Sequence, residues 1–208
     1  MIKTEDLKFK YPSGESFDFK NIDLKKKEHL LVLGPSGVGK TTLLHLLSGI
    51  LPASRGKITI DQTDITSLDR RSLDRFRGQN IGLIFQQYHY VRSLTVEENL
   101  KVRQQYPKKL KDQERRHALC ERLGLTSLMN KFVFDLSQGQ KQRLAIALGL
   151  IHQPKVVLAD EPTSNLDDIN CSKVIALLQE EARLCGSNLV IITHDQRIKE
   201  HFNSHLLL

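Results

Sequence analysis

The 208-residue sequence has no tryptophan, only three cysteines and no long apolar run. The cysteines, Cys120, Cys171 and Cys185, are odd in number and widely spaced, which fits neither a disulfide framework nor a Cys-x-x-Cys metal or redox site. The longest apolar run, near residues 144–151, is far short of the roughly 20 residues that a membrane-spanning helix needs. Because Met1 to Asp6 also lack the apolar core of a secretory signal, we expect the protein to stay in the cytosol.

Positive charge exceeds negative charge, and the formal net charge of +7 suggests a nucleic-acid partner. The basic residues, however, form three separate clusters near Lys25 to Lys27, Arg70 to Arg77 and Lys108 to Arg116. Clusters dispersed in this way do not build the continuous aromatic and basic platform on which bases stack. A solvated surface near anionic lipid head groups explains them more simply, and we expect no nucleic-acid partner.

The composition, with 39% hydrophobic and 26% charged residues, is that of a globular protein, and the length predicts one domain over residues 1–208. Short apolar runs bounded by polar or turn residues predict five buried strands, at Leu30 to Leu33, Ile58 to Ile60, Ile81 to Phe85, Val156 to Ala159 and Leu189 to Ile192. Helical patterns lie between them, as at Thr42 to Gly49 and Ser172 to Leu184. This alternation predicts an α/β fold, with a parallel sheet covered on both faces.

Two segments depart from the alternation of strand and helix. Apolar and polar residues alternate from Leu7 to Leu24, which predicts a small lobe of antiparallel strands at the edge of the sheet. The sequence from Arg92 to Phe134 is helical in character, most clearly at Arg115 to Leu123. We therefore expect an inserted helical lobe over approximately residues 92–150.

A glycine-rich segment follows the strand Leu30 to Leu33 directly, and it consists of Gly34, Pro35, Ser36, Gly37, Val38, Gly39, Lys40 and Thr41. The pattern G-x-x-x-x-G-K-[ST] between a strand and a helix is the phosphate loop of P-loop NTPases. Its glycines let successive backbone N–H groups and the helix N-terminus point at phosphate oxygens. We expect this segment with Thr42 to bind ATP, Lys40 to reach the β and γ phosphates, and the Thr41 hydroxyl to ligate Mg²⁺.

Polar side chains follow two further predicted strands. Asp160 and Glu161 come directly after the run Val156 to Ala159, where a buried parallel strand opens onto the crevice at its carboxyl end. We expect Asp160 to hold Mg²⁺ and Glu161 to polarise a water for attack on the γ-phosphate. His194 follows the run Leu189 to Ile192 at the same edge, and a contact with the γ-phosphate is favoured over a structural role.

In the order of these motifs, and in the segment Leu136-Ser137-Gln138-Gly139-Gln140, the chain resembles the ATP-binding cassette family of transporter motor domains over essentially its whole length. The resemblance implies that Tyr11 stacks on the adenine, although a core position in the β lobe is the alternative. It implies that Gln86, or alternatively the adjacent Gln87, contributes to catalysis and links Mg²⁺ and the attacking water to a membrane partner. It places Asp167 in communication between two cassettes, whereas the residues alone also fit a simple helix N-cap.

The signature of the family is usually Leu-Ser-Gly-Gly-Gln. Ser137 and Gly139 precede a predicted helix, Lys141 to Leu150, and a helix N-terminus with a small hydroxyl residue is an anion site. In this family that site, here Ser137, Gln138, Gly139 and Gln140, serves the ATP of a partner, so two cassettes sandwich two nucleotides head to tail. Gln138 departs from the pattern, and it would be strained if the backbone there needed a positive φ.

The resemblance implies an ATPase that energises a separate transmembrane permease as a homodimer on the cytoplasmic face of the inner membrane. Tyr90, Tyr88 and the run Leu94 to Leu100 look like the compact bacterial cassettes for lipoprotein release, macrolide export and cell division. A regulatory or cell-division role without transport is therefore the alternative. Cassettes that act on ribosomes or DNA carry two cassettes or a long insertion, for which Gln86 to Leu136 has no room.

Overall fold

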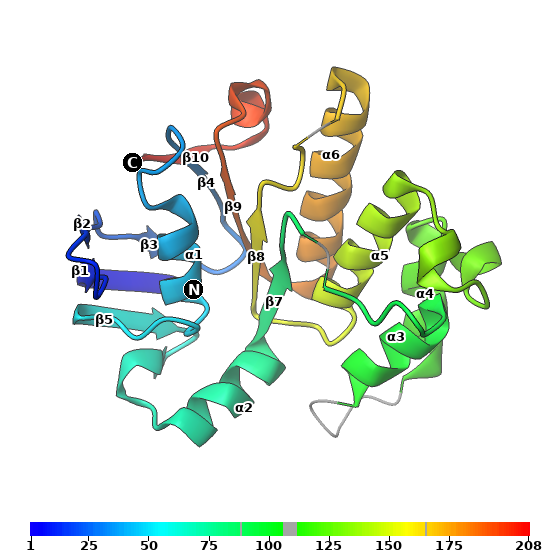
Figure 1. Ribbon diagram of the computed structural model, residues 1–208, viewed down its shortest axis with the longest axis horizontal. Coiled ribbons are helices and arrows are strands. Elements are labelled where there is room, and N and C mark those ends of the chain that lie inside the picture. The colour runs from blue at the N-terminus through cyan, green and yellow to red at the C-terminus, as the bar shows by residue number, and fades with distance from the viewer. Residues whose placement is uncertain (88, 106–111, 165) are drawn as a thin grey trace.

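The computed structural model describes residues 1–87, 89–105, 112–164 and 166–208 and contains two sheets with helices between and beside them (Figure 1). Tyr88, residues 106–111 and Asn165 lie outside the described part, and so do Lys108, Lys109 and Lys111 of the third basic cluster.

The central sheet has the strand order β10-β4-β9-β8-β7, and all its neighbouring strands are parallel. Its strands are β4 (His29–Leu33), β7 (Ile81–Ile84), β8 (Val156–Asp160), β9 (Asn188–Thr193) and β10 (Ser204–Leu207). Successive residues point to opposite faces, so Leu31 and Ile191 belong to one core and Val32 and Ile192 to another. Burial on both faces explains why these strands are continuous apolar runs in the sequence.

The second sheet is antiparallel and contains β1 (Ile2–Lys10), β2 (Ser16–Asp18), β3 (Asp23–Leu24), β5 (Arg55–Ile60) and β6 (Thr63–Asp64). The helix α1 (Lys40–Leu47) lies between the two sheets, where Leu43, Leu44 and Leu46 are fully buried (Figure 1). The antiparallel strands predicted from Leu7 to Leu24 are therefore confirmed, but they belong to a separate sheet that faces the central one across a shared core and do not join its edge.

The strand predicted at Ile58 to Ile60 belongs to β5 and not to the parallel sheet, so that part of the prediction was wrong. The chain turns back into β6 through Asp61 and Gln62, whose φ values are 45° and 73°. Two central residues with positive φ form the tight turn that joins antiparallel strands. Ile58 and Ile60 face the shared core while their neighbours do not, which is the period of two of a strand buried on one face. The predicted run of three residues is too short to reveal this period.

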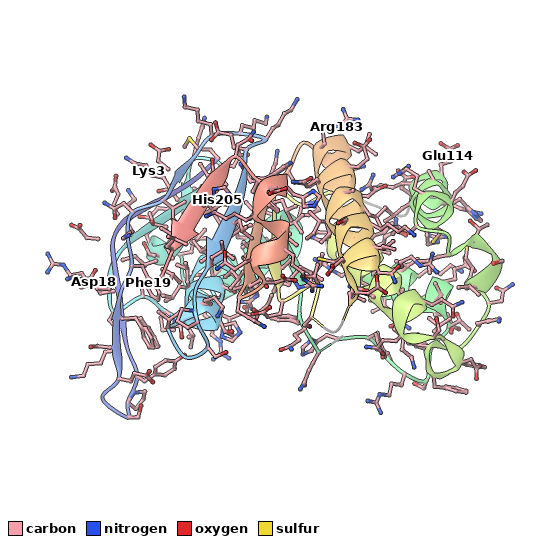
Figure 2. The ribbon with its side chains drawn as sticks, turned by 90° about the horizontal axis from the view of Figure 1, so that it is seen from above. Lys3, Asp18, Phe19, Glu114, Arg183 and His205 are labelled. Carbon is pink, nitrogen blue, oxygen red and sulfur yellow. The ribbon has the colours of Figure 1, made fainter. Side chains whose placement is uncertain are left out.

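The helical elements between residues 92 and 150 lie on the side of the central sheet that is away from the antiparallel sheet. They are α3 (Val96–Gln104), α4 (Gln113–Arg122), α5 (Gln138–Leu150) and the short 3-10 turns Thr126–Leu128 and Val133–Asp135. The helix α6 (Asp168–Cys185) lies between this lobe and the antiparallel sheet, as Arg183, Glu114 and Lys3 mark in Figure 2. The buried Glu181 of α6 accepts two hydrogen bonds from Arg122 of α4, at 2.5 and 3.0 Å. This ion pair ties the lobe to the core.

The remaining helix and turns connect these layers: α2 (Arg70–Asn80), which has no buried residue, and the 3-10 turns Ile65–Ser67 and Gln196–His201. No helix was predicted at α2 from the sequence. Its apolar residues Leu73 and Phe76 are only partly buried, so it presents no broad apolar stripe.

Helix α5 approaches the central sheet through two glycines. A Cβ atom added to Gly82 of β7 would lie 2.1 Å from the carbonyl oxygen of Gly149, and one added to Gly149 would lie 2.8 Å from Ile84. Side chains at these positions would therefore push α5 away from β7, and with it the segment that begins at Ser137.

We predict that Gly82→Ala destabilises the protein by roughly 1–3 kcal/mol, because overpacking against backbone has no flexible neighbour to relieve it. Urea unfolding measures the change. Gly139→Ala is the control, since a Cβ there meets nothing within 4 Å and alanine favours a helix. Equal stability of Gly82→Ala and the parent protein would show that α5 does not pack against β7 in this way.

Candidate active site

Most of the predicted site residues lie together, because the parallel strands β4, β7, β8 and β9 all end at one edge of the sheet. A cavity of about 420 Å³ opens at this edge. Its described lining consists of Tyr11, Glu15, Phe17, Ser36, Gly37, Gly39, Lys40, Thr41, Thr42, Gln86, Asp160 and Glu161. Gln86, and not its neighbour Gln87, is thus among the described lining residues.

The glycine-rich loop needs its glycines for two different reasons. Gly37 and Gly39 have φ values of 85° and 98°, in the left-handed region that other residues rarely adopt. A Cβ atom at Gly39 would also lie 2.5 Å from the ring of Phe17. Gly39 caps α1, and its cap has no side-chain hydrogen bond, which leaves the first backbone N–H groups of the helix to an anion.

Lys40 is only 7% exposed, and its ammonium lies over the loop. Its Nζ atom donates hydrogen bonds to the carbonyl oxygens of Gly34 and Pro35, both at 2.8 Å. An ammonium has three N–H donors, so one remains for an oxygen in the cavity. The loop therefore holds the Lys40 ammonium beside the N-terminus of α1, which has no side-chain cap.

Tyr11 lies beside this loop at the end of β1. Its hydroxyl is 3.0 Å from the hydroxyl of Thr42, and its ring meets Phe9 and Phe17 edge to face. The ring is half-buried and packs on the core that α1 shares, yet it also lines the cavity. Tyr11 is therefore both a core residue of the β lobe and a wall of the site, as Phe17 is.

Thr41 and Asp160 form the most polar part of the cavity. The Thr41 hydroxyl donates to Asp160 Oδ2 at 3.1 Å, and Gln86 lines the same space. Burial raises the pKa of Asp160 above its ordinary value, although the bond from Thr41 opposes this shift. A hydroxyl, a carboxylate and an amide carbonyl are hard oxygen donors, and this set suits Mg²⁺.

No group of three or more His, Cys, Asp or Glu side chains among the described residues is arranged to hold a metal ion.

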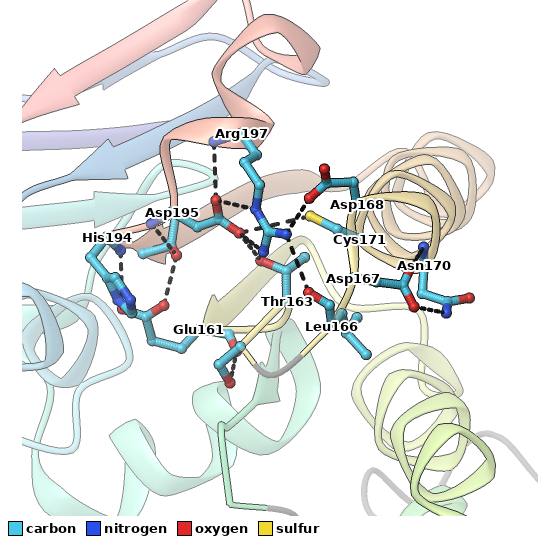
Figure 3. Close-up of polar contacts among 12 residues, drawn as sticks. Glu161, Thr163, Leu166, Asp167, Asp168, Asn170, Cys171, His194, Asp195 and Arg197 are labelled. Atoms are coloured by element: carbon cyan, nitrogen blue, oxygen red, sulfur yellow. Dashed lines mark hydrogen bonds and ion pairs between the residues drawn. The ribbon is translucent and has the colours of Figure 1, made fainter.

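Glu161 is held tightly by the end of β9 (Figure 3). Its carboxylate accepts hydrogen bonds from the Thr193 hydroxyl at 2.6 Å and from the His194 backbone N–H at 3.1 Å, and it lies 2.8 Å from His194 Nδ1. Glu161 itself has a φ of 49°, which is uncommon for a residue with a side chain. The structure thus brings Glu161 and His194 into direct contact, with the His194 side chain 61% exposed.

Three residues that the sequence analysis did not assign also contribute to this site. Thr193 bonds Glu161, and Phe17 and Glu15 line the cavity. A signal for Thr193 was present, since it directly follows an apolar strand and precedes His194. No local pattern marks Phe17 or Glu15, because only the folding of the antiparallel sheet brings them to the loop.

Asp167 is the N-cap of α6, where it accepts hydrogen bonds from the backbone N–H and the side-chain amide of Asn170, at 2.8 and 2.7 Å. These bonds, the backbone N–H first, lower the pKa of Asp167. The helix N-cap, which was the alternative that the sequence offered for Asp167, therefore accounts for its contacts within one chain.

Ser137 is the N-cap of α5, and the structure adds that it forms a capping box with Gln140. Gln138 begins α5 and is not among the residues with positive φ, so it does not carry the strain considered above. Ser137, Gln138 and Gly139 are exposed, and none of the described residues that line the cavity belongs to α5. The start of α5 is therefore not part of the described lining of the cavity.

Relatives of the chain are ATP-binding proteins. The sequence pattern of the family described as ABC transporter matches residues 18–164. The lipoprotein-releasing system ATP-binding protein LolD of Legionella pneumophila (strain Paris) is 39% identical over 197 residues, which cover 91% of this chain and 85% of LolD. The bacitracin export ATP-binding protein BceA of Halalkalibacterium halodurans is 37% identical over 181 residues, which cover 85% of this chain and 71% of BceA.

Two solved structures share the fold. The ATP-binding cassette MJ0796, a dimer in a post-hydrolysis state bound to ADP and Pi, has a TM-score of 0.87 at 30% identity and covers 100% of this chain and 94% of its own. The protein cbiO1 of Clostridium perfringens, part of the ABC transporter complex cbiONQ, has a TM-score of 0.85 at 31% identity and covers 99% of this chain and 83% of its own. The chain therefore belongs to the ABC transporter family, as one of its ATP-hydrolysing subunits.

Proposed function

We propose that this chain acts as one cassette over residues 1–208 and uses ATP hydrolysis to drive a separate transmembrane permease. The observation that carries the proposal is the single cavity in which the loop cation Lys40, the acidic Asp160 and the strained Glu161 meet. In this assignment Gly34 to Thr42 hold the phosphates, and Tyr11 stacks on the adenine.

Glu161 is the general base of this proposal, and Gln86 and His194 assist it. The Glu161 carboxylate accepts hydrogen bonds from Thr193 and His194, which fix it at the end of β8 facing the cavity. From there it accepts a proton from a water that attacks the γ-phosphate in line. Thr41, Asp160 and Gln86 would hold Mg²⁺, which would neutralise negative charge on the phosphates.

We further propose that two copies of this chain pair head to tail, so that α5 of each completes the nucleotide site of the other. Two features support this: α5 begins with an exposed serine-capped N-terminus, and that end does not line the cavity of its own chain. The N-terminus of a helix favours anions, and the Ser137 hydroxyl has a proton to donate. Asp167, exposed at the start of α6, would contact the partner beside it.

The permease is a proposal that the names of the relatives support, since LolD belongs to a lipoprotein-releasing system and BceA to bacitracin export. These names favour transport over a regulatory or cell-division role. No helix in the described part of the chain is long and apolar enough to span a bilayer. We place the protein on the cytoplasmic face of the inner membrane, where a permease would hold it.

We predict that Glu161→Gln lowers the rate of ATP hydrolysis by about 10²-fold or more, because an amide does not accept the proton of the attacking water. Binding of ATP with Mg²⁺ should persist, and the variant should accumulate as a dimer in size-exclusion chromatography. The matched control is Glu180→Gln, an exposed carboxylate of α6 that forms an ion pair with Arg183. Turnover of Glu161→Gln near that of the control would remove Glu161 from this role.

We also predict that the hydrolysis rate per chain rises with protein concentration, since each complete site needs two chains. Steady-state rates measured from nanomolar to micromolar protein at saturating ATP test this. A rate per chain that stays constant, while sedimentation shows a monomer throughout, would contradict the shared site.

Asp160→Asn should stabilise the nucleotide-free protein while weakening hydrolysis. Burial raises the pKa of Asp160 in the folded chain, so its ionised form costs stability at neutral pH. The uncharged amide removes this cost, so Tm at pH 7 should rise. The gain should shrink as pH falls through the raised pKa of folded Asp160 and vanish below the ordinary carboxyl pKa, where the aspartate is protonated in both states. Asp18→Asn, at an exposed ion pair with Lys8, is the control and should change Tm little. A lower Tm for Asp160→Asn at pH 7 would be contrary to this account.

A further inference from the structure

Arg197 joins two segments of the site that are far apart in the sequence (Figure 3). It lies in the 3-10 turn Gln196–His201, three residues after His194. Its Nε and Nη2 atoms donate to the two carboxylate oxygens of Asp195, at 2.9 and 2.8 Å. Its Nη1 atom donates to Asp168 Oδ1 at 2.6 Å and to the carbonyl oxygen of Leu166 at 3.2 Å. One guanidinium thus connects the turn after β9 to the start of α6.

This arrangement requires an arginine. The planar fork places donors on two sides, so it makes a bidentate pair with Asp195 and still reaches Leu166 and Asp168. A lysine ammonium is a point charge and would contact one side only. The hydrogen bonds from Arg197 keep the pKa of Asp195 below its ordinary value, and they raise the pKa of Arg197.

Asp195 extends the connection into the interior. Its side chain is 12% exposed, and its Oδ2 atom also accepts a hydrogen bond from the Thr163 hydroxyl at 3.3 Å. Thr163 itself is fully buried, two residues after Glu161. Three points of one loop, Thr163, Leu166 and Asp168, therefore converge on the Arg197–Asp195 pair.

The same turn also holds the Glu161 carboxylate. The backbone N–H of Asp195 donates to the Thr193 hydroxyl at 3.0 Å, and that hydroxyl donates to Glu161 at 2.6 Å. A continuous series of contacts thus runs from the exposed Asp168 through Arg197, Asp195 and Thr193 to Glu161. Asp167, the residue proposed to meet a second copy, lies next to Asp168 at the outer end of this series.

We propose that Arg197 is a positioning residue, which fixes the turn of Thr193 and His194 against the start of α6 and so sets the placement of Glu161. The proposal rests on the function proposed above, because it assigns Glu161 to hydrolysis. It adds that the position of the segment around Asp167, where a partner would bind, determines how Glu161 is held.

The test compares Arg197→Gln with Arg197→Lys and with Arg183→Gln, whose exposed ion pair with Glu180 is remote from these contacts. Loss of the charged hydrogen bonds should lower kcat of Arg197→Gln by about tenfold, with KM for ATP changed less than about twofold, because the phosphate loop is untouched. Lysine should not restore the rate, and Arg183→Gln should match the parent protein. An unchanged kcat in Arg197→Gln overturns the proposal, and so does a loss of kcat with an equal loss of ATP affinity.

A second variant distinguishes a loss of positioning from misfolding. Asp168 is 85% exposed, so Asp168→Asn should fold normally. Its effect on kcat should be smaller than that of Arg197→Gln and should not add to it in the double variant, since both remove the same contact. Fully additive effects contradict the series of contacts. Lys40→Ala separates the two proposals: if it abolishes hydrolysis while the Arg197 variants do not slow it, only the role of Arg197 fails.

Discussion

The alignment of four parallel strand ends is the constraint on which the site depends. Strands β4, β7, β8 and β9 end at one edge of the sheet, so the residues that follow each strand are neighbours in space. One strand end provides the phosphate loop, another Gln86, the third Asp160 and Glu161, and the last Thr193 and His194. A shift of β4, β8 or β9 would separate Lys40 from Asp160 or Glu161 from His194.

The helical lobe lies away from this edge. It carries the start of α5, which in the proposed function completes the nucleotide site of a second copy. Its helix α5 is seated on β7 by the close approach of Gly82 and Gly149, and the ion pair of Arg122 with Glu181 attaches α4 to α6. This rigid attachment leaves the start of α5 exposed, with Ser137 as its cap. In the proposed dimer, this exposed helix start would meet the nucleotide that the second chain holds.

The sequence revealed the parts of the site that depend on local pattern. The glycine loop and Asp160 with Glu161 directly follow apolar runs, and His194 follows one after Thr193, so their position at the sheet edge could be predicted before the structure was known. The family fold and the ATPase activity were confirmed by the comparisons with known proteins. The roles of the individual residues stay predictions.

Other features depend on contacts between distant segments and had no local signal. β5 was assigned to the wrong sheet, because three residues cannot distinguish a strand buried on one face from one buried on both. Phe17 reaches Gly39 only after the antiparallel sheet has folded over α1. Arg197 is one of 31 basic residues in the sequence, and only the fold reveals that it bridges Asp195 and Asp168.

The most direct test of the shared nucleotide site is a structure of the Glu161→Gln protein with ATP and Mg²⁺ bound. We predict a head-to-tail dimer in which the Ser137 hydroxyl of one copy lies within hydrogen-bond distance of the γ-phosphate held by the other. A nucleotide-loaded dimer in which Ser137 and the start of α5 face solvent, away from any phosphate, would contradict the account.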